Sequence, residues 1–141
     1  MWLSLVVQCV GLTYDVIWHG LLNPRFEAVT VAQMVRHLGT VHLPLYIGVV
    51  GMLLSSAWAL VDQLKRSEIG VAVPVAFVGS LVQTAGESWH AYTHLQLTTH
   101  SGPIAFTVSF FGMLIVACAL VLGWRRGRRR VASGVEGRRA A

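Results

Sequence analysis

The sequence predicts an all-α protein, an integral membrane bundle of four helices that run alternately up and down. Two observations predict this fold. Of the 141 residues, 55% are hydrophobic and only 12% are charged, whereas soluble domains carry about 25% charged residues. Four apolar runs also follow one another along the chain, each with about the 20 residues that cross a bilayer. They cover residues 2–22, 41–61, 71–94 and 103–124.

Proline residues mark the start of three of these helices. Thr40 can cap the second helix, and Pro44 then falls in its first turn, where the missing N–H of proline does no harm. Pro74 occupies a similar position in the third helix, and Pro103 begins the fourth. The four runs are therefore separate helices with short connections, which favours an up-down-up-down bundle.

Basic residues are concentrated at one end of the predicted bundle. Lys65 and Arg66 lie between the second and third helices, and five arginines follow the fourth, within residues 125–130. By the positive-inside rule, this distribution places both termini in the cytoplasm, in a multi-pass protein of the cell membrane. Residues 1–124 form the predicted transmembrane domain, and residues 125–141 are predicted to be a disordered basic tail. Such a tail is typical of a topology signal that contacts anionic membrane lipid, and not of a nucleic-acid partner.

Ionisable side chains gather at the opposite, non-cytoplasmic end. At a rise of 1.5 Å per residue, five of them from three helices fall within a slab about 8 Å thick. These five are Asp15, His19, His42, Glu87 and His90. Asp15 and His19 are four residues apart, and Glu87, His90 and His94 stand at i, i+3 and i+7, so each set occupies one helix face.

A metal ion is the simplest reason to place these groups together. Ionisable groups inside a membrane are costly and mark functional sites, and a metal offsets the cost by binding neutral imidazoles and carboxylates. The predicted ligands are Asp15, His19, His37, His42, Glu87, His90, His94 and His100. His37 and His100 fall in predicted loops, and His94 falls near the membrane interface, where a solvated histidine is the alternative. A hydrogen-bonded polar network is the alternative for the five deep groups.

Two family resemblances rest on these residues. Residues 14–19 (YDVIWH) and 42–48 (HLPLYIG) resemble the D-x-x-W-H and P-H-L-x-L-Y-x-G motifs of uncharacterised bacterial membrane proteins, which implies that Asp15, His19 and His42 belong together. Asp15 and His19, with His42 or His37, also resemble the aspartate and two histidines that hold copper in the C subunit of particulate methane and ammonia monooxygenases. That resemblance implies a copper site inside the bilayer.

The preferred functional hypothesis is a membrane metalloenzyme, an oxidoreductase or monooxygenase-like protein that acts on a lipid-soluble substrate. Copper is the favoured metal, with a di-iron centre or zinc as alternatives. Glu87 is the candidate catalytic carboxylate, either beside a second ion or as a proton-transfer or ligand-orienting group. A copper-handling accessory protein and a small haem b protein are the competing hypotheses. A homo-oligomer or a larger membrane complex is compatible with each.

Overall fold

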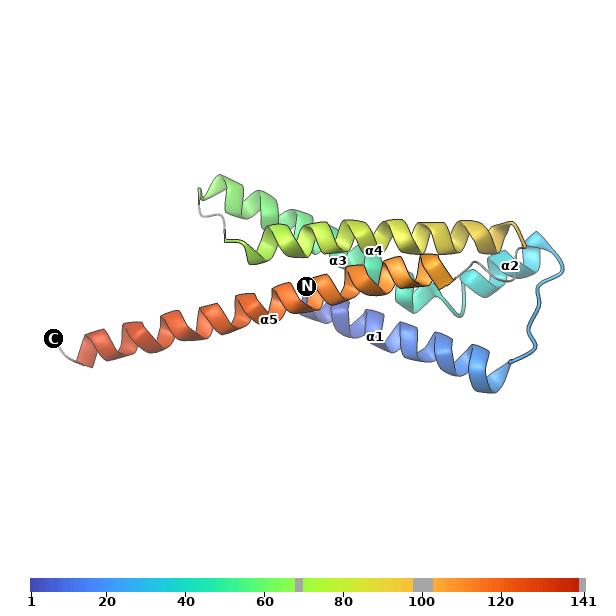
Figure 1. The fold of residues 1–141 in the computed structure, drawn as a ribbon, viewed down its shortest axis with the longest axis horizontal. Helices are drawn as coiled ribbons and strands as arrows, with labels where there is room; N and C mark the ends of the chain where they lie inside the picture. The colour runs from blue at the N-terminus through green and yellow to red at the C-terminus, as the bar shows by residue number, and fades with distance from the viewer. Residues whose placement is uncertain (68–69, 98–102, 140–141) are drawn as a thin grey trace.

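The computed structural model describes residues 1–67, 70–97 and 103–139, and all regular structure in these ranges is helical (Figure 1). The elements are α1 (Trp2–Ile17), the π-helical segment η1 (Trp18–Leu22), α2 (Val31–Leu38), α3 (Leu43–Lys65), α4 (Ala72–Leu95) and α5 (Pro103–Arg139). The all-α prediction is therefore confirmed for the described part of the chain. The long helices are α1, α3, α4 and α5, and the short helix α2 lies at one end of them (Figure 1).

Helices α1 and α3 pack closely and run antiparallel. The Gln8 side chain donates a hydrogen bond to the carbonyl oxygen of Gly48, at 2.8 Å. One turn further along α1, a Cβ atom added to Gly11 would overlap the backbone of Leu45. A Cβ atom added to Gly48 would likewise overlap the backbone of Gln8. Glycine at these two positions allows the backbones to approach, as small residues do between membrane helices.

Helices α4 and α5 form a second close antiparallel pair. A Cβ atom at Gly86 would overlap the backbone of Ser109, and a Cβ atom at Gly112 would overlap the backbone of Gln83. The two pairs join through α3 and α4, where the hydroxyl oxygens of Ser56 and Ser80 are 2.9 Å apart. Each long helix is thus antiparallel to the helix that follows it in the bundle.

The interior between the helices combines apolar side chains, such as Met52 and Val116, with buried polar ones. Gln83 donates a hydrogen bond to Gln8 at 3.0 Å, and both side chains are buried. On α4, the polar side chains at positions 80, 83, 87, 90 and 94 follow helical spacing, so they occupy one continuous stripe. Buried polar groups need hydrogen-bond partners, and the glutamine pair and the serine pair supply one for Gln8 Oε1, for Gln83 Nε2 and for each serine hydroxyl across the helix interfaces.

The outer surface of the long helices carries many exposed apolar side chains. Among the described residues, three segments are long and apolar enough to cross a membrane, and less than a third of each is buried: Trp2–Leu22, Leu43–Lys65 and Ile104–Arg128. These correspond to three of the four predicted spans. Helix α4 has 24 residues, enough for a crossing, but its polar stripe lowers its hydropathy, and in the described chain it is not among the candidate spans.

Three local expectations differ from the structure. Residues 31–38, expected in a loop, form helix α2, which Thr30 caps by accepting a hydrogen bond from the amide of Gln33 at 3.2 Å. Thr40, the expected cap of the second long helix, lies in the turn before it, and His42 occupies the N-cap position. Residues 125–139, expected to be disordered, continue helix α5; arginine and alanine are good helix formers.

Candidate metal centre

Five imidazole side chains meet at the end of the bundle where α2 lies. They come from four segments of the chain: η1 supplies His19, α2 supplies His37, the start of α3 supplies His42, and α4 supplies His90 and His94. Ligand atoms of these side chains form two groups, and within each group they lie within 4.8 Å of one another. The groups are His19, His37 and His42, and His42, His90 and His94. His42 therefore belongs to both.

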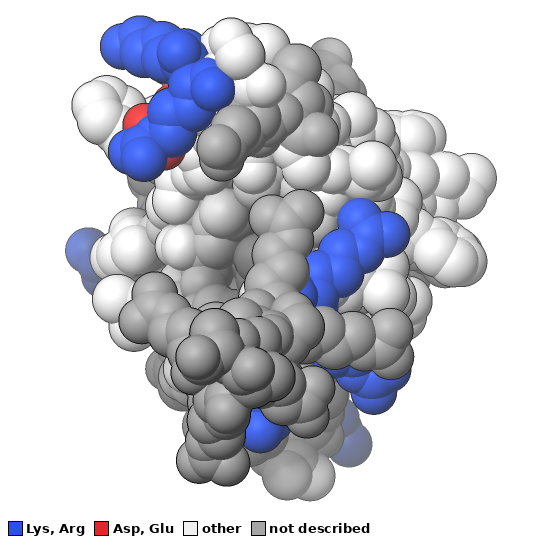
Figure 2. Space-filling view, turned by 90° about the vertical axis from the view of Figure 1, so that its left-hand side faces the viewer, with Lys and Arg blue, Asp and Glu red and all other residues white. Residues whose placement is uncertain are grey.

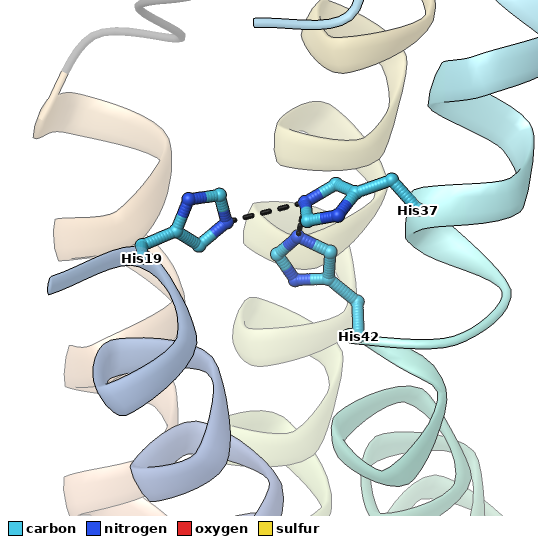
Figure 3. A group of neighbouring side chains, drawn as sticks. All are labelled: His19, His37 and His42. Atoms are coloured by element: carbon cyan, nitrogen blue, oxygen red, sulfur yellow. Dashed lines mark hydrogen bonds between the residues drawn. The ribbon is translucent and has the colours of Figure 1, made fainter. Parts of the chain in front are cut away.

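In the first group, three Nε2 atoms converge (Figure 3). The Nε2 atom of His37 is 3.2 Å from that of His19 and 3.2 Å from that of His42. An imidazole nitrogen offers either one N–H or one lone pair, so His37 Nε2 cannot make two ordinary hydrogen bonds to these atoms. Two imidazole nitrogens bound to one ion at about 2.0–2.1 Å would be about 3.4 Å apart in a tetrahedral site. The observed spacing is close to that value and suits a shared cation.

The second group has similar contacts on the other side of His42. The Nε2 atoms of His90 and His94 are 3.0 Å apart, and the ring centroid of His42 lies 5.6 Å from that of His90 and 5.4 Å from that of His94. His42 is 1% exposed, so it sits between the two groups without access to solvent. The five imidazoles form one continuous cluster.

A short turn brings His37 and His42 together, although they are only five residues apart. The amide of Val41 donates a hydrogen bond to the His37 carbonyl oxygen at 2.8 Å, and the Thr40 hydroxyl contacts the same oxygen at 3.2 Å. These contacts end α2 and direct the chain into α3. The two imidazoles face each other across this turn, so the turn defines the first group.

The π-helical segment η1 positions His19. A π-helical turn carries an extra residue and is frequent at functional sites. His19 lies in this segment, one turn beyond Asp15, and its Nε2 atom is 3.5 Å from Asp15 Oδ1. Trp18 precedes it and packs on His37, with ring centroids 4.6 Å apart. The segment therefore supplies both a histidine and part of the wall around the first group.

Asp15 lies directly beneath the first group. Its Oδ1 atom is 3.4 Å from His42 Nδ1 and 3.5 Å from His19 Nε2. Carboxylates beside metal-binding histidines commonly orient the imidazole and fix its tautomer. Asp15 Oδ1 and His42 Nδ1 are both buried and lack a hydrogen bond that satisfies geometric criteria. The predicted association of Asp15, His19 and His42 is thus a contact in the structure.

His37 is the residue whose position differs most from expectation. It is buried on helix α2, 4% exposed, where sequence reasoning placed it in a solvated loop. Phe26 packs on one side of its ring, with centroids 4.6 Å apart. Burial, together with repulsion from His19 and His94, lowers the pKa of His37 to about 4. The imidazole is neutral at pH 7, which is the form that binds metal.

Glu87 lies in neither histidine group among the described residues. Its Oε1 atom accepts a hydrogen bond from Ser109 Oγ of α5, whereas the rings of His90 and His94 lie beside that of His42. Its Oε2 atom is buried and has no hydrogen-bond partner. The role of Glu87 as a ligand stays a prediction. His100 lies outside the described residues.

Sequence reasoning did not identify Tyr46 as part of the site. Its ring stacks on His42, with centroids 5.9 Å apart and an interplanar angle of 19°. The position i+4 relative to His42 was a usable signal, because residues four apart share a helix face. An aromatic residue near the membrane interface is normally assigned to the aromatic belt. That general expectation gives no reason to predict the contact between Tyr46 and His42.

Comparison of the chain with protein-family models, with curated proteins and with solved structures finds no match. The interpretation of the site therefore rests on its geometry. Within the residues that the structure describes, the chain is all-helical, has three helices that can cross a membrane and has histidine groups that can hold a metal ion.

Proposed function

We propose that this chain is a multi-pass membrane metalloprotein whose five clustered histidines hold the metal at the non-cytoplasmic end of a four-helix bundle. The observation that carries the proposal is the convergence of His19, His37, His42, His90 and His94 in two groups that share His42. A hydrogen-bonded network explains this geometry less well, because the three Nε2 atoms of the first group compete for the same proton.

The membrane placement rests on the distribution of polar and apolar surface. The outer surface of α1, α3 and α5 is apolar, and α4 directs its polar stripe inward. Basic side chains surround the end opposite the histidines, as Figure 2 shows. At this end lie Lys65, Arg66, Arg125, Arg126 and Arg128. We propose that α4 is the fourth crossing and that this basic end faces the cytoplasm of the cell membrane.

The donor set supports a metalloenzyme over a carrier of soft cuprous ion. Cys9 and Cys118 are exposed on the outside of the described structure, and Met34 is buried in an apolar cluster with Ala28 and Leu38. Imidazole nitrogen is thus the main donor, which suits copper(II), iron or zinc. We propose copper, as the resemblance to the monooxygenase copper triad implies, with a di-iron centre or zinc as alternatives.

The proposed reaction is oxidation of a lipid-soluble substrate. When bound, the metal would supply redox or oxygen chemistry, and this chain would supply the surrounding acid–base groups. Asp15 orients His42 through the Nδ1 atom, which leaves His42 Nε2 for the metal, whereas its contact with His19 is to Nε2 itself. Glu87, one turn below His90 on α4, is placed to hold or move a proton beneath the centre.

A metal-exchange function has one observation in its favour. The side chain of His19 is 37% exposed, so the first group is open to the outside of the bundle, as a site that loads and releases metal would be. Haem is favoured less, because its axial histidines face each other across a broad flat macrocycle. Here the imidazole nitrogens lie 3.0–3.2 Å apart.

Metal analysis of the detergent-purified protein, combined with absorption and paramagnetic resonance spectra, tests the proposal. We expect bound copper with the spectroscopic signature of nitrogen ligands. Two variants provide the comparison: His42→Ala removes the shared histidine, and Gln96→Ala removes an exposed polar residue at the same end of α4. Metal content equal in both variants and in the unaltered protein would contradict a histidine-bound centre.

A further inference from the structure

Helices α3 and α4 leave a groove of about 230 Å³ between them, directly below the histidine cluster. Its lining is largely apolar and includes Val49, Val50 and Ala91. Val50 is 52% exposed, so the groove opens on the outer, membrane-facing surface of the bundle and not only toward its end. A molecule dissolved in the bilayer can therefore reach it sideways.

Two residues that line this groove carry buried oxygen atoms with no hydrogen-bond partner. They are the hydroxyl of Tyr46, on α3, and the Oε2 atom of Glu87, on α4. Glu87 is only 8% exposed. Leaving such an atom unpaired in an apolar environment is unfavourable, most of all for a charged group, so the pair indicates a ligand that supplies the missing hydrogen bonds.

The chemistry of the two atoms defines the headgroup. A carboxylate oxygen accepts a hydrogen bond, and a tyrosine hydroxyl can donate one. A ligand hydroxyl has the chemistry that both atoms lack, because it can donate to a carboxylate oxygen and accept from a tyrosine hydroxyl. An anionic headgroup would be repelled by Glu87 and by the nearby carboxylate of Asp15. The apolar lining requires the rest of the ligand to be lipophilic.

We propose that the α3–α4 groove is a substrate site for a lipophilic alcohol or phenol, whose hydroxyl binds between Tyr46 and Glu87. The groove is adjacent to the candidate metal centre, because the ring of Tyr46 stacks on His42 at a centroid distance of 5.9 Å. This inference deepens the proposed function by naming a substrate class. Binding of the alcohol itself requires no metal.

Photolabelling in lipid nanodiscs tests the inference. A decan-1-ol analogue with a diazirine in its chain is activated by light, and the labelled peptides are identified by mass spectrometry. Unlabelled decan-1-ol and octyl methyl ether then compete with it at equal mole fractions in the bilayer. The ether accepts a hydrogen bond but cannot donate one, so it lacks the contact to Glu87.

A second groove in the same protein provides the internal control. It measures about 380 Å³, lies at the opposite end of the bundle and is lined by Trp2, Ala76, Leu120 and Trp124 among others. None of its lining residues is among the described residues with unpartnered buried atoms. Labelling at this second groove measures binding that depends only on the apolar chain of the probe.

We expect decan-1-ol to compete about tenfold better than the ether at the α3–α4 groove, the effect of one hydrogen bond to a charged group, and equally well at the control groove. Glu87→Gln should reduce this advantage. Tyr46→Phe keeps the aromatic ring on His42 and should weaken competition by the alcohol and the ether alike, because both accept a hydrogen bond from Tyr46. Equal competition by alcohol and ether in the unaltered protein would overturn the inference and assign the groove to lipid chains. Metal content measured on the same samples tests the proposed metal centre separately.

Discussion

At the scale of single residues, His42 determines whether the centre is one cluster or two separate groups. It is the only histidine common to both groups of the described structure, and it is fully buried. Sequence reasoning placed His42 correctly near the top of a helix because the positions of apolar runs set helix ends. It could not show that His37 faces His42, since that contact depends on the turn at Thr40 and Val41.

Substitution of the shared histidine should have a larger effect than substitution within either group. We expect His42→Ala to weaken metal binding by more than His19→Ala or His90→Ala, each of which leaves one group intact. Loss of a group that only orients a ligand already costs about 10–100-fold in affinity, so His42→Ala should cost at least that. Metal titrations of the three variants show which substitution lowers the metal affinity most. His100→Ala should have little effect, and an equal loss in all four variants would contradict the two-group geometry.

The pKa of His37 predicts a pH dependence of the metal-free fold. Its pKa is about 4 in the folded protein, because of burial and of repulsion from His19 and His94, and about 6.5 in an unfolded chain. Between these values the unfolded chain binds the proton and the folded protein does not, so stability is present above pH 6.5 and falls as the pH decreases toward 4. One group contributes at most about 1.4 kcal/mol per pH unit.

Thermal unfolding of the metal-free protein between pH 7.5 and 4.5 measures this dependence. The His37→Gln variant removes the titrating group and keeps a polar side chain, so its stability should fall less steeply over the same range. An unchanged slope in this variant would show that His37 does not cause the effect.

At the scale of helices, glycine contacts and polar pairs determine which faces meet. The sequence was sufficient to predict the long helices, since their apolar runs and prolines are local signals. It was not sufficient for α2, whose eight residues form a short helix that packs at the bundle end. Its Met34 and Leu38 are buried with Ala28, and these tertiary contacts stabilise the helix. A search for long apolar runs in the sequence cannot detect such contacts.

A side chain at position 48 should prevent the close approach of α1 and α3. A Cβ atom there would overlap the backbone of Gln8, so we expect Gly48→Val to destabilise the protein by about 1–3 kcal/mol or more. It should also weaken metal binding, because His42 on α3 and Asp15 on α1 would separate. Unfolding in detergent micelles measures the stability. Gly20→Ala is the matched control, because a Cβ atom at Gly20 has no neighbour within 4 Å and should change stability by less than about 0.5 kcal/mol.

At the scale of the whole molecule, the bundle has an apolar outer surface and an interior that includes a stripe of polar side chains, with histidines at one end and basic residues at the other. This arrangement follows from α4 in particular. The polar stripe at positions 80, 83, 87, 90 and 94 lowers the hydropathy of α4, yet this stripe contacts α3 through Ser80 and α5 through Glu87. An ionisable stripe on an interior face is the pattern expected of a functional membrane helix.

The number of crossings fixes the location of the C-terminus, which makes the topology testable. If α1, α3, α4 and α5 all cross, reporter fusions after Arg66 and after Ala141 should both be cytoplasmic, and a fusion after Glu27 should lie outside. If α4 does not cross, only three crossings remain and the fusion after Ala141 moves to the outside. The basic residues favour the first arrangement, as does the antiparallel packing of α4 on both α3 and α5. An external Ala141 fusion beside a cytoplasmic Arg66 fusion would contradict the four-helix membrane bundle, and an external Arg66 fusion would place the histidine cluster on the cytoplasmic side.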